Sequence, residues 1–123
     1  MHTQFVEDIP IPLILHICGK TVDRMQYIAQ TGMAAFHYDS KNDPDESMCI
    51  CEQRISLVGN VNNPQTLYSQ GPQQVREEVI RNLDAHVQLV GAECAIPLQT
   101  PIENLKAIPS AVRDWHREHA AKN

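Results

Sequence analysis

The sequence predicts an α/β fold in which four βα units build one parallel sheet. Apolar runs that suit strands alternate with amphipathic segments that suit helices, and each segment is long enough to cross between parallel strands. The apolar runs are short and uninterrupted, which is typical of parallel strands covered on both faces. The four predicted strands are Pro12–Cys18, Ala34–Tyr38, Ile55–Val61 and Glu93–Leu98.

The first two predicted helices have recognisable ends. Apolar residues recur at helical spacing from Val22 to Ala29, and Gly32 stands where a helix often ends in a left-handed residue. The second helix opens at Asp43, with proline at its first position and Glu46 three residues after the cap. We expect it to run to about Glu52.

The later helices are predicted in the same way. The third lies between Gly71 and Gly91. Its apolar stripe consists of Val75, Val79, Leu83, Val87 and Val90. The segment Thr100–Glu103 reads as a capping box that opens a fourth helix. Pro109 is expected to separate this helix from a final amphipathic one that runs through Trp115.

These elements predict one domain over residues 1–123. The order βαβαβαβα requires right-handed crossovers, and four such units make half of an eightfold (β/α)8 barrel. A chain of 123 residues with 42% hydrophobic content has enough apolar surface for one core. The sequence shows no linker and no low-complexity tract.

Composition restricts the partners and the location. The formal net charge is -5 and no Lys/Arg block occurs, so nucleic acid is not an expected partner. The segment Met1–Pro12 has no positively charged region, and the apolar run after it is short, so neither a signal peptide nor a membrane span is expected. Four cysteines without a secretion signal favour a reducing compartment, and we predict a cytoplasmic protein.

A candidate metal site follows from strand geometry. Residues two apart in a strand point to the same face, so His16 and Cys18 present a nitrogen and a sulfur together, just before Gly19. Cys94, in the last predicted strand, offers a second thiol. One His and two thiolates form a zinc set with an open fourth position, the catalytic pattern. The residues alone leave an alternative open, because buried Cys and His residues often only pack in a core.

Other polar residues have two interpretations. Asp39 and Asn60 follow strands at the same predicted rim, where they would contact substrate or support a metal ligand, or would instead only hold turn and loop backbone. Cys49 and Cys51 lie two apart on a helix and face different ways, so we interpret them as incidental thiols. His37 is expected to pack at a strand end.

The proposed site depends on the shape of the sheet. In a flat sheet the first and fourth strands lie roughly 14 Å apart, which is three spacings of about 4.8 Å. Cys94 would then not reach His16 and Cys18. A shared metal ion therefore requires barrel-like curvature.

Three motifs carry a resemblance to a known family. The stretches "LHICGKT", "ISLVGNVNNPQTL" and "GAECAIPLQTPIENLKAI" resemble the C-terminal half of the methylcobalamin:coenzyme M methyltransferases, which belong to the uroporphyrinogen decarboxylase superfamily of TIM barrels. The resemblance extends from about Pro10 to Val112. It implies zinc as a cofactor, held by His16, Cys18 and Cys94.

The resemblance also implies an enzyme activity and partners. The expected reaction moves a methyl group from a methylated corrinoid protein to a thiol such as coenzyme M. Members of the family are complete barrels, so the first four βα units are missing and a partner is expected, either an N-terminal half-barrel or a second copy. Glu93 stands where relatives can carry a smaller residue, and it adds a charge near the proposed metal.

Two further functions remain open at this point. One is a non-catalytic or vestigial half-barrel subunit that binds a corrinoid protein or a partner half. The other is a decarboxylase that acts on a porphyrinogen. The pair His16 and Cys18 argues against the decarboxylase, because that chemistry needs no soft metal ligands.

Overall fold

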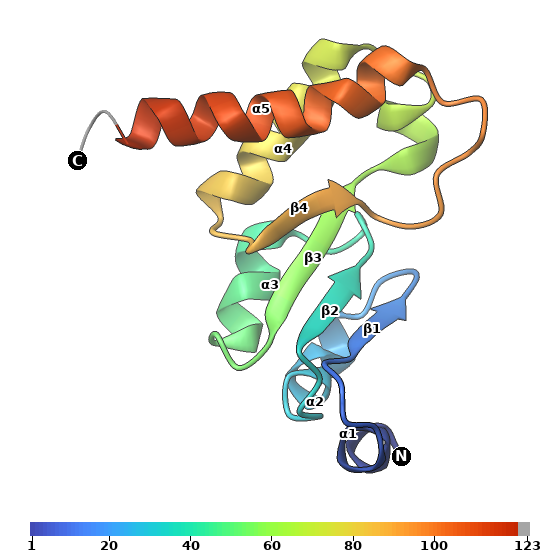
Figure 1. Cartoon of the computed structure of the whole chain (residues 1–123), viewed down its shortest axis with the longest axis vertical. Coiled ribbons are helices and arrows are strands. Elements are labelled where there is room, and N and C mark those ends of the chain that lie inside the picture. Colours follow the sequence, from blue (N-terminus) through green and yellow to red (C-terminus); the bar gives the residue numbers. More distant parts are fainter. Residues whose placement is uncertain (121–123) are drawn as a thin grey trace.

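A computed structural model gives the fold of the chain and describes residues 1–120. Four parallel strands form one sheet in the order β1-β2-β3-β4, as Figure 1 shows. Their bounds are β1 Ile14–Ile17, β2 Ala35–Tyr38, β3 Ser56–Val61 and β4 Leu89–Ala92. The predicted α/β fold with a parallel sheet is therefore confirmed.

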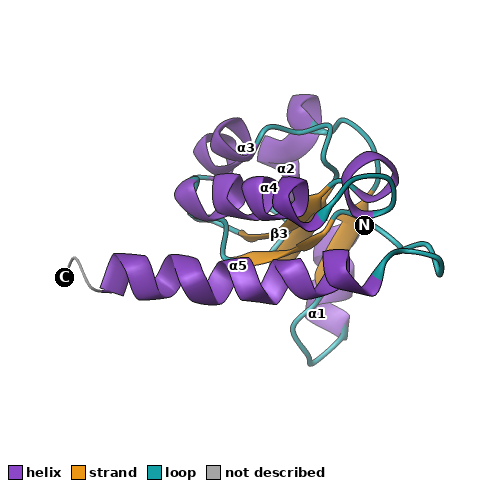
Figure 2. Ribbon diagram, turned by 90° about the horizontal axis from the view of Figure 1, so that it is seen from above, coloured by secondary structure: helices purple, strands orange, loops and turns teal. Residues whose placement is uncertain are grey.

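Helices connect the strands and extend the chain at both ends. They are α1 His2–Asp8, the 3-10 turn η1 Val22–Arg24, α2 Met25–Ile28, α3 Pro44–Cys51, the π-helical turn η2 Asn63–Leu67, α4 Pro72–Asp84 and α5 Ile102–Ala120. Seen from above in Figure 2, α2, α3 and α4 gather on one side of the strands. Among residues 1–120, no helix combines the length and the apolar character that a membrane crossing needs.

The core lies between the sheet and these helices. One cluster joins β2 and β3 to α2 and α3, and its buried members include Phe36, Tyr38, Leu57, Met25 and Cys51. A second cluster joins the end of β3 to α4 and α5, and it consists of Val61, Leu67, Val75, Val79, Leu83 and Ala111. Leu15 and Val90 pack against the first cluster, so their strand neighbours Ile14 and Leu89 point to the opposite face. These two side chains are 60% and 54% exposed.

Two predicted helix signals have their expected geometry. The Asp43 carboxylate accepts the Glu46 backbone N–H at 3.1 Å and caps α3, whose C-cap residue is Glu52. Gly32 has a φ of 80°, in the left-handed region that glycine occupies without a steric penalty. The first crossover contains only a 3-10 turn followed by the four-residue α2, so its helix is shorter than predicted.

The prediction for the fourth strand is wrong. Helix α4 ends at Asp84 rather than near Gly91, because the chain turns at His86, which has a φ of 66°. Val87 then packs into the core from outside the helix, and Leu89–Ala92 forms β4. The segment predicted as a strand, Glu93–Leu98, is loop.

The prediction for the last helix is also wrong in two respects. Pro109 lies inside α5, which is continuous from Ile102 to Ala120. The helix persists because one face packs against α4 through side chains that include Ala111 and Trp115. The Thr100 hydroxyl is buried and has no hydrogen-bond partner, so the predicted cap does not form. The sequence patterns did not predict α1 or η2.

The sheet is curved. His37 Nε2 on β2 donates a hydrogen bond to the Ala92 carbonyl on β4 at 2.7 Å, across the intervening strand β3. In a flat sheet these two strands lie roughly 9.6 Å apart, which is two spacings of about 4.8 Å. The curvature required by the predicted site is therefore present, and the imidazole of His37 bridges the concave face.

Candidate metal centre

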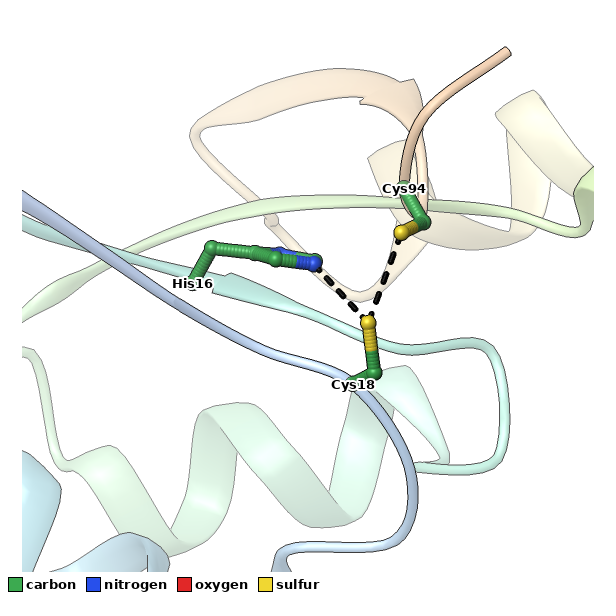
Figure 3. Close-up of side chains that lie close together, drawn as sticks. All are labelled: His16, Cys18 and Cys94. Carbon is green, nitrogen blue, oxygen red and sulfur yellow. Dashed lines mark hydrogen bonds between the residues drawn. The ribbon is translucent and has the colours of Figure 1, made fainter. Parts of the chain in front are cut away.

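The side chains of His16, Cys18 and Cys94 converge at the carboxyl ends of the first and last strands, as Figure 3 shows. His16 lies within β1, Cys18 directly follows it, and Cys94 lies two residues after β4. His16 Nε2 is 3.1 Å from Cys18 Sγ, which is 3.4 Å from Cys94 Sγ. All three donor atoms lie within 4.8 Å of one another.

The hydrogen bonds of His16 select one tautomer. Its Nδ1 is 3.1 Å from the His37 carbonyl oxygen, which only accepts, so Nδ1 carries the proton. The lone pair of Nε2 therefore faces the two thiols. A ligand histidine commonly donates its other ring N–H to a carbonyl in this way. The His37 ring supports the arrangement, with its centroid 4.6 Å from that of His16.

The donor set fits a soft divalent metal such as zinc. Tetrahedral zinc with Zn–S distances of about 2.3 Å separates two sulfur ligands by about 3.8 Å. The observed Sγ–Sγ distance of 3.4 Å needs only a small opening to match this value. Three protein ligands leave a fourth position for a substrate, and His16 and Cys18 are exposed, so a small molecule has access to it.

The Cys18 thiol is harder to deprotonate than an ordinary thiol. The pKa of the Cys18 thiol lies above its usual value, first because of its hydrogen bond with Cys94, then because of partial desolvation and the negative charges of nearby groups. At neutral pH the Cys18 thiol therefore holds its proton unless a cation replaces it.

The sequence also matches a known protein family. The model of the uroporphyrinogen decarboxylase (URO-D) family matches residues 2–115. The chain belongs to the URO-D family.

Several similar proteins are named methyltransferases. A methylated-thiol–coenzyme M methyltransferase from Methanosarcina mazei is 30% identical over 121 residues, covering 92% of this chain and 30% of that protein. The methylcobamide:CoM methyltransferase MtaA from Methanosarcina barkeri is 29% identical over 104 residues, covering 84% of this chain and 31% of that protein. The URO-D chain thus spans about a third of the length of these relatives.

A solved structure confirms the fold of this URO-D chain. A methyltransferase from Methanosarcina mazei superposes with a TM-score of 0.90 at 25% sequence identity, covering 94% of this chain and 34% of that chain. The predicted family resemblance and the predicted barrel-type α/β fold are both confirmed.

Asp39 holds backbone beside the donor cluster. Its carboxylate accepts the Gly19 N–H at 2.8 Å and the Lys41 N–H at 2.9 Å. Partial burial raises the pKa of this carboxyl, but the Gly19 and Lys41 N–H donors, with contributions from the Glu93 side chain and the Lys41 charge, leave the pKa below its usual value. Asp39 therefore fixes the turn that follows Cys18, as one of its two sequence interpretations expects.

Asn60 lies away from the donor cluster. Its Nδ2 donates to the Asn42 carbonyl at 2.8 Å, and its Oδ1 accepts from Asn82 Nδ2 at 3.1 Å. It lines a polar cavity of about 190 Å³ beside α4, together with Arg81 and Glu78. The nitrogen and the oxygen of the Asn60 amide both form hydrogen bonds within the protein, which agrees with the interpretation that Asn60 holds loop backbone.

Sequence reasoning missed the role of Glu93. Glu93 is buried, and its carboxylate accepts backbone N–H groups from two neighbouring loops. The only sequence signal was an acidic residue beside a proposed ligand.

Cys49 is exposed and Cys51 is buried, and burial raises the pKa of the Cys51 thiol to about 11. Neither belongs to the donor cluster, as predicted.

Proposed function

We propose that this chain is a zinc-dependent methyltransferase domain, or part of one, that moves a methyl group from a methylated corrinoid protein to a small thiol such as coenzyme M. The observation that carries the proposal is the convergence of one imidazole nitrogen and two thiols in a URO-D chain. The similar proteins named methylcobamide:CoM methyltransferases support the choice of donor and acceptor. A cytoplasmic location remains a prediction.

His16 Nε2, Cys18 Sγ and Cys94 Sγ would hold the metal. Bound zinc lowers the pKa of a coordinated thiol and thereby supplies a thiolate, the form of sulfur that attacks carbon. In the overall reaction the thiol releases its proton, a sulfur–carbon bond forms, and the cobalt–carbon bond breaks with its electron pair staying on the corrinoid.

The chain's own residues prepare this site. The His37 carbonyl holds the proton on His16 Nδ1, so that Nε2 keeps its lone pair for the metal. As thiolate ligands the two cysteines would contribute negative charge, which would keep a substrate sulfur at the open position electron-rich. Asp39 fixes Gly19 at 2.8 Å and so limits the movement of Cys18. No residue of the chain forms a covalent intermediate in this scheme.

Metal analysis of variants tests the ligand set. We expect the purified chain to bind one zinc ion, Cys94→Ala to lose it, and Cys49→Ala to retain it. Cys49 is the matched control, because it is an exposed thiol outside the cluster. Stoichiometric zinc in Cys94→Ala would contradict the proposed site.

A second experiment tests the reaction. The chain is mixed with methylcobalamin and coenzyme M, with and without zinc, and demethylation is followed by absorbance. Zinc-dependent conversion supports the enzyme. If conversion is absent even when a candidate N-terminal half is added, the alternative of a non-catalytic subunit is favoured, because such a subunit folds and associates without turnover.

A further inference from the structure

The peptide that carries Cys94 is anchored on its N-terminal side by Glu93. This side chain is only 5% exposed. Its Oε2 accepts the Ser40 N–H at 2.7 Å and its Oε1 accepts the Asn63 N–H at 2.9 Å, so one carboxylate joins the loops after β2 and β3. Its own N–H donates to the Val61 carbonyl at 3.0 Å.

The same peptide is anchored on its C-terminal side by Asn63. Asn63 is 4% exposed, and its Nδ2 donates to the Ala95 carbonyl at 2.8 Å. The Ala95 carbonyl fixes the orientation of the Asn63 side-chain amide, because the amide oxygen, if it were turned toward that carbonyl, would be repelled by it. Asn63 therefore contacts both residues that flank Cys94, through its backbone N–H on one side and its side chain on the other.

The two thiols differ in how the fold supports them. Cys18 directly follows β1, so the backbone hydrogen bonds between β1 and β2 hold it in place. Cys94 lies in loop, and loop backbone is more mobile than strand backbone unless other bonds hold it. In Figure 3 Cys94 reaches Cys18 from its own segment above the other two ligands.

We propose that Glu93 and Asn63 are positioning residues that hold the Cys94 thiol at metal-binding distance from Cys18 and His16. The inference rests on the proposed function, because it assigns these residues to the metal site. Neither side chain is a ligand. Their bonds restrict the Cys94 peptide before metal arrives, so less freedom is lost on binding.

The test compares Glu93→Gln with Glu78→Gln in the full chain. Glu78 is the matched control, because its carboxylate accepts the Asn62 N–H at 2.8 Å in the same loop but is not adjacent to a ligand. In Glu93→Gln an amide NH2 replaces one of the two carboxylate oxygens, so a donor faces the N–H of Ser40 or Asn63 and one of the two hydrogen bonds is lost. Zinc affinity is measured by competition with a chromophoric chelator, and thiolate-to-cobalt charge transfer is measured with Co²⁺.

We expect Glu93→Gln to weaken zinc binding about 10- to 100-fold, the usual effect of losing an outer-shell partner, and to reduce the charge-transfer band. Glu78→Gln keeps wild-type affinity and the wild-type band. Asn63→Ala keeps its backbone bond to Glu93 and loses one neutral hydrogen bond, so a loss of about fivefold is expected. Wild-type affinity in Glu93→Gln, or an equal loss in Glu78→Gln, overturns the proposal.

A metal-free measurement separates this inference from the proposed function. If the wild-type chain binds neither Zn²⁺ nor Co²⁺, the proposed metal site fails, but the positioning role is still tested. The rate at which a bifunctional thiol reagent bridges Cys18 and Cys94 is measured in a Cys49→Ser background. Slower bridging in Glu93→Gln than in Glu78→Gln supports the positioning role, and equal rates overturn it.

Discussion

Gly59, in β3, occupies a position where only glycine fits. Its φ is 136°, and a Cβ placed there would lie 2.8 Å from the Tyr38 carbonyl oxygen on β2. Both the backbone conformation and the contact with a neighbouring strand therefore exclude a side chain. The chain approaches β2 this closely one residue before Asn60, whose amide donates to the Asp39 and Asn42 carbonyls in the loop after β2.

Gly59→Ala should lower the free energy of unfolding by about 1–3 kcal/mol, because the backbone would be strained and β2 would have to shift. Urea denaturation measures the change. Gly91→Ala is the matched control, since Gly91 lies in the adjacent strand β4 with no atom within 4 Å of an added Cβ. A change within about 0.5 kcal/mol is expected for Gly91→Ala, and equal effects at both sites would contradict the argument.

Asp43 shows how a single cap contributes a pH-dependent stability. The pKa of its carboxyl is lowered: the Glu46 backbone N–H has the largest effect, burial opposes it, and the Arg81 guanidinium adds to the lowering. Because the folded pKa lies below the unfolded value of about 3.9, the contribution is fully present above that value. It is lost as the pH falls through the folded pKa.

Asp43→Ala should cost about 1 kcal/mol at pH 7, the usual value of an N-cap. The difference from wild type should shrink as the pH falls below about 4, when the Asp43 carboxyl takes up a proton. Asp43→Asn keeps a capping oxygen but loses the charge that faces Arg81, so its stability at pH 7 should lie between those of Asp43→Ala and wild type. Chemical denaturation across pH 2.5–7 checks these expectations, and a constant Asp43→Ala difference would refute them.

At the scale of elements, α5 shows tertiary packing overriding a local signal. Pro109 removes one backbone hydrogen bond from the helix interior, a cost of about 3 kcal/mol in a typical helix. The helix is nevertheless continuous, because its apolar face is buried against α4. The Trp115 indole N–H also donates to Asp84 at 2.8 Å, which ties the helix to the end of α4.

Pro109→Ala should therefore stabilise the chain by about 1–3 kcal/mol, because an exposed helical position regains a backbone N–H. Thermal unfolding measures the gain. Ser110→Ala, at the next position, removes no proline and should change stability by only a few tenths of a kcal/mol. A neutral or destabilising Pro109→Ala would contradict this prediction, because it would mean that other contacts in the fold offset the cost of the proline.

Helix and strand patterns were predictable where local chemistry decided them. The cap at Asp43 and the buried runs of β2 and β3 give signals within a few residues, and the structure contains those elements at nearly the predicted bounds. The boundary between α4 and β4 was not predictable. Val87 and Val90 continue the helical spacing by coincidence, while a left-handed turn at His86 sends the chain into the sheet.

At the scale of the molecule, the concave face of the sheet is uncovered by the described residues. Ile14 and Leu89 are exposed there, on the first and last strands, and both of these strands have one unpaired edge in the sheet. Unpaired edges and exposed apolar side chains favour association. A second copy or an N-terminal half-barrel therefore remains the predicted partner.

Leu89→Lys should weaken self-association of the chain at least about tenfold, because burying a leucine is worth about 1.5–3 kcal/mol. Sedimentation velocity across a range of concentrations measures the association. Tyr27→Lys, at an aromatic position on α2 that is 64% exposed, is the control and should leave association unchanged. A wild-type chain that stays monomeric throughout would count against self-pairing.

The fold class and the family could be read from the sequence, and so could the prediction of His16, Cys18 and Cys94 as a metal site, because strand periodicity, caps and motifs are local patterns. Only the tertiary structure decided that the donors meet. That depends on the curvature of the sheet, seen in the bond from His37 to Ala92, and on the loop that carries Cys94. Glu93 shows the limit most clearly, because its two partners lie 53 and 30 residues away in the chain and no local pattern encodes them.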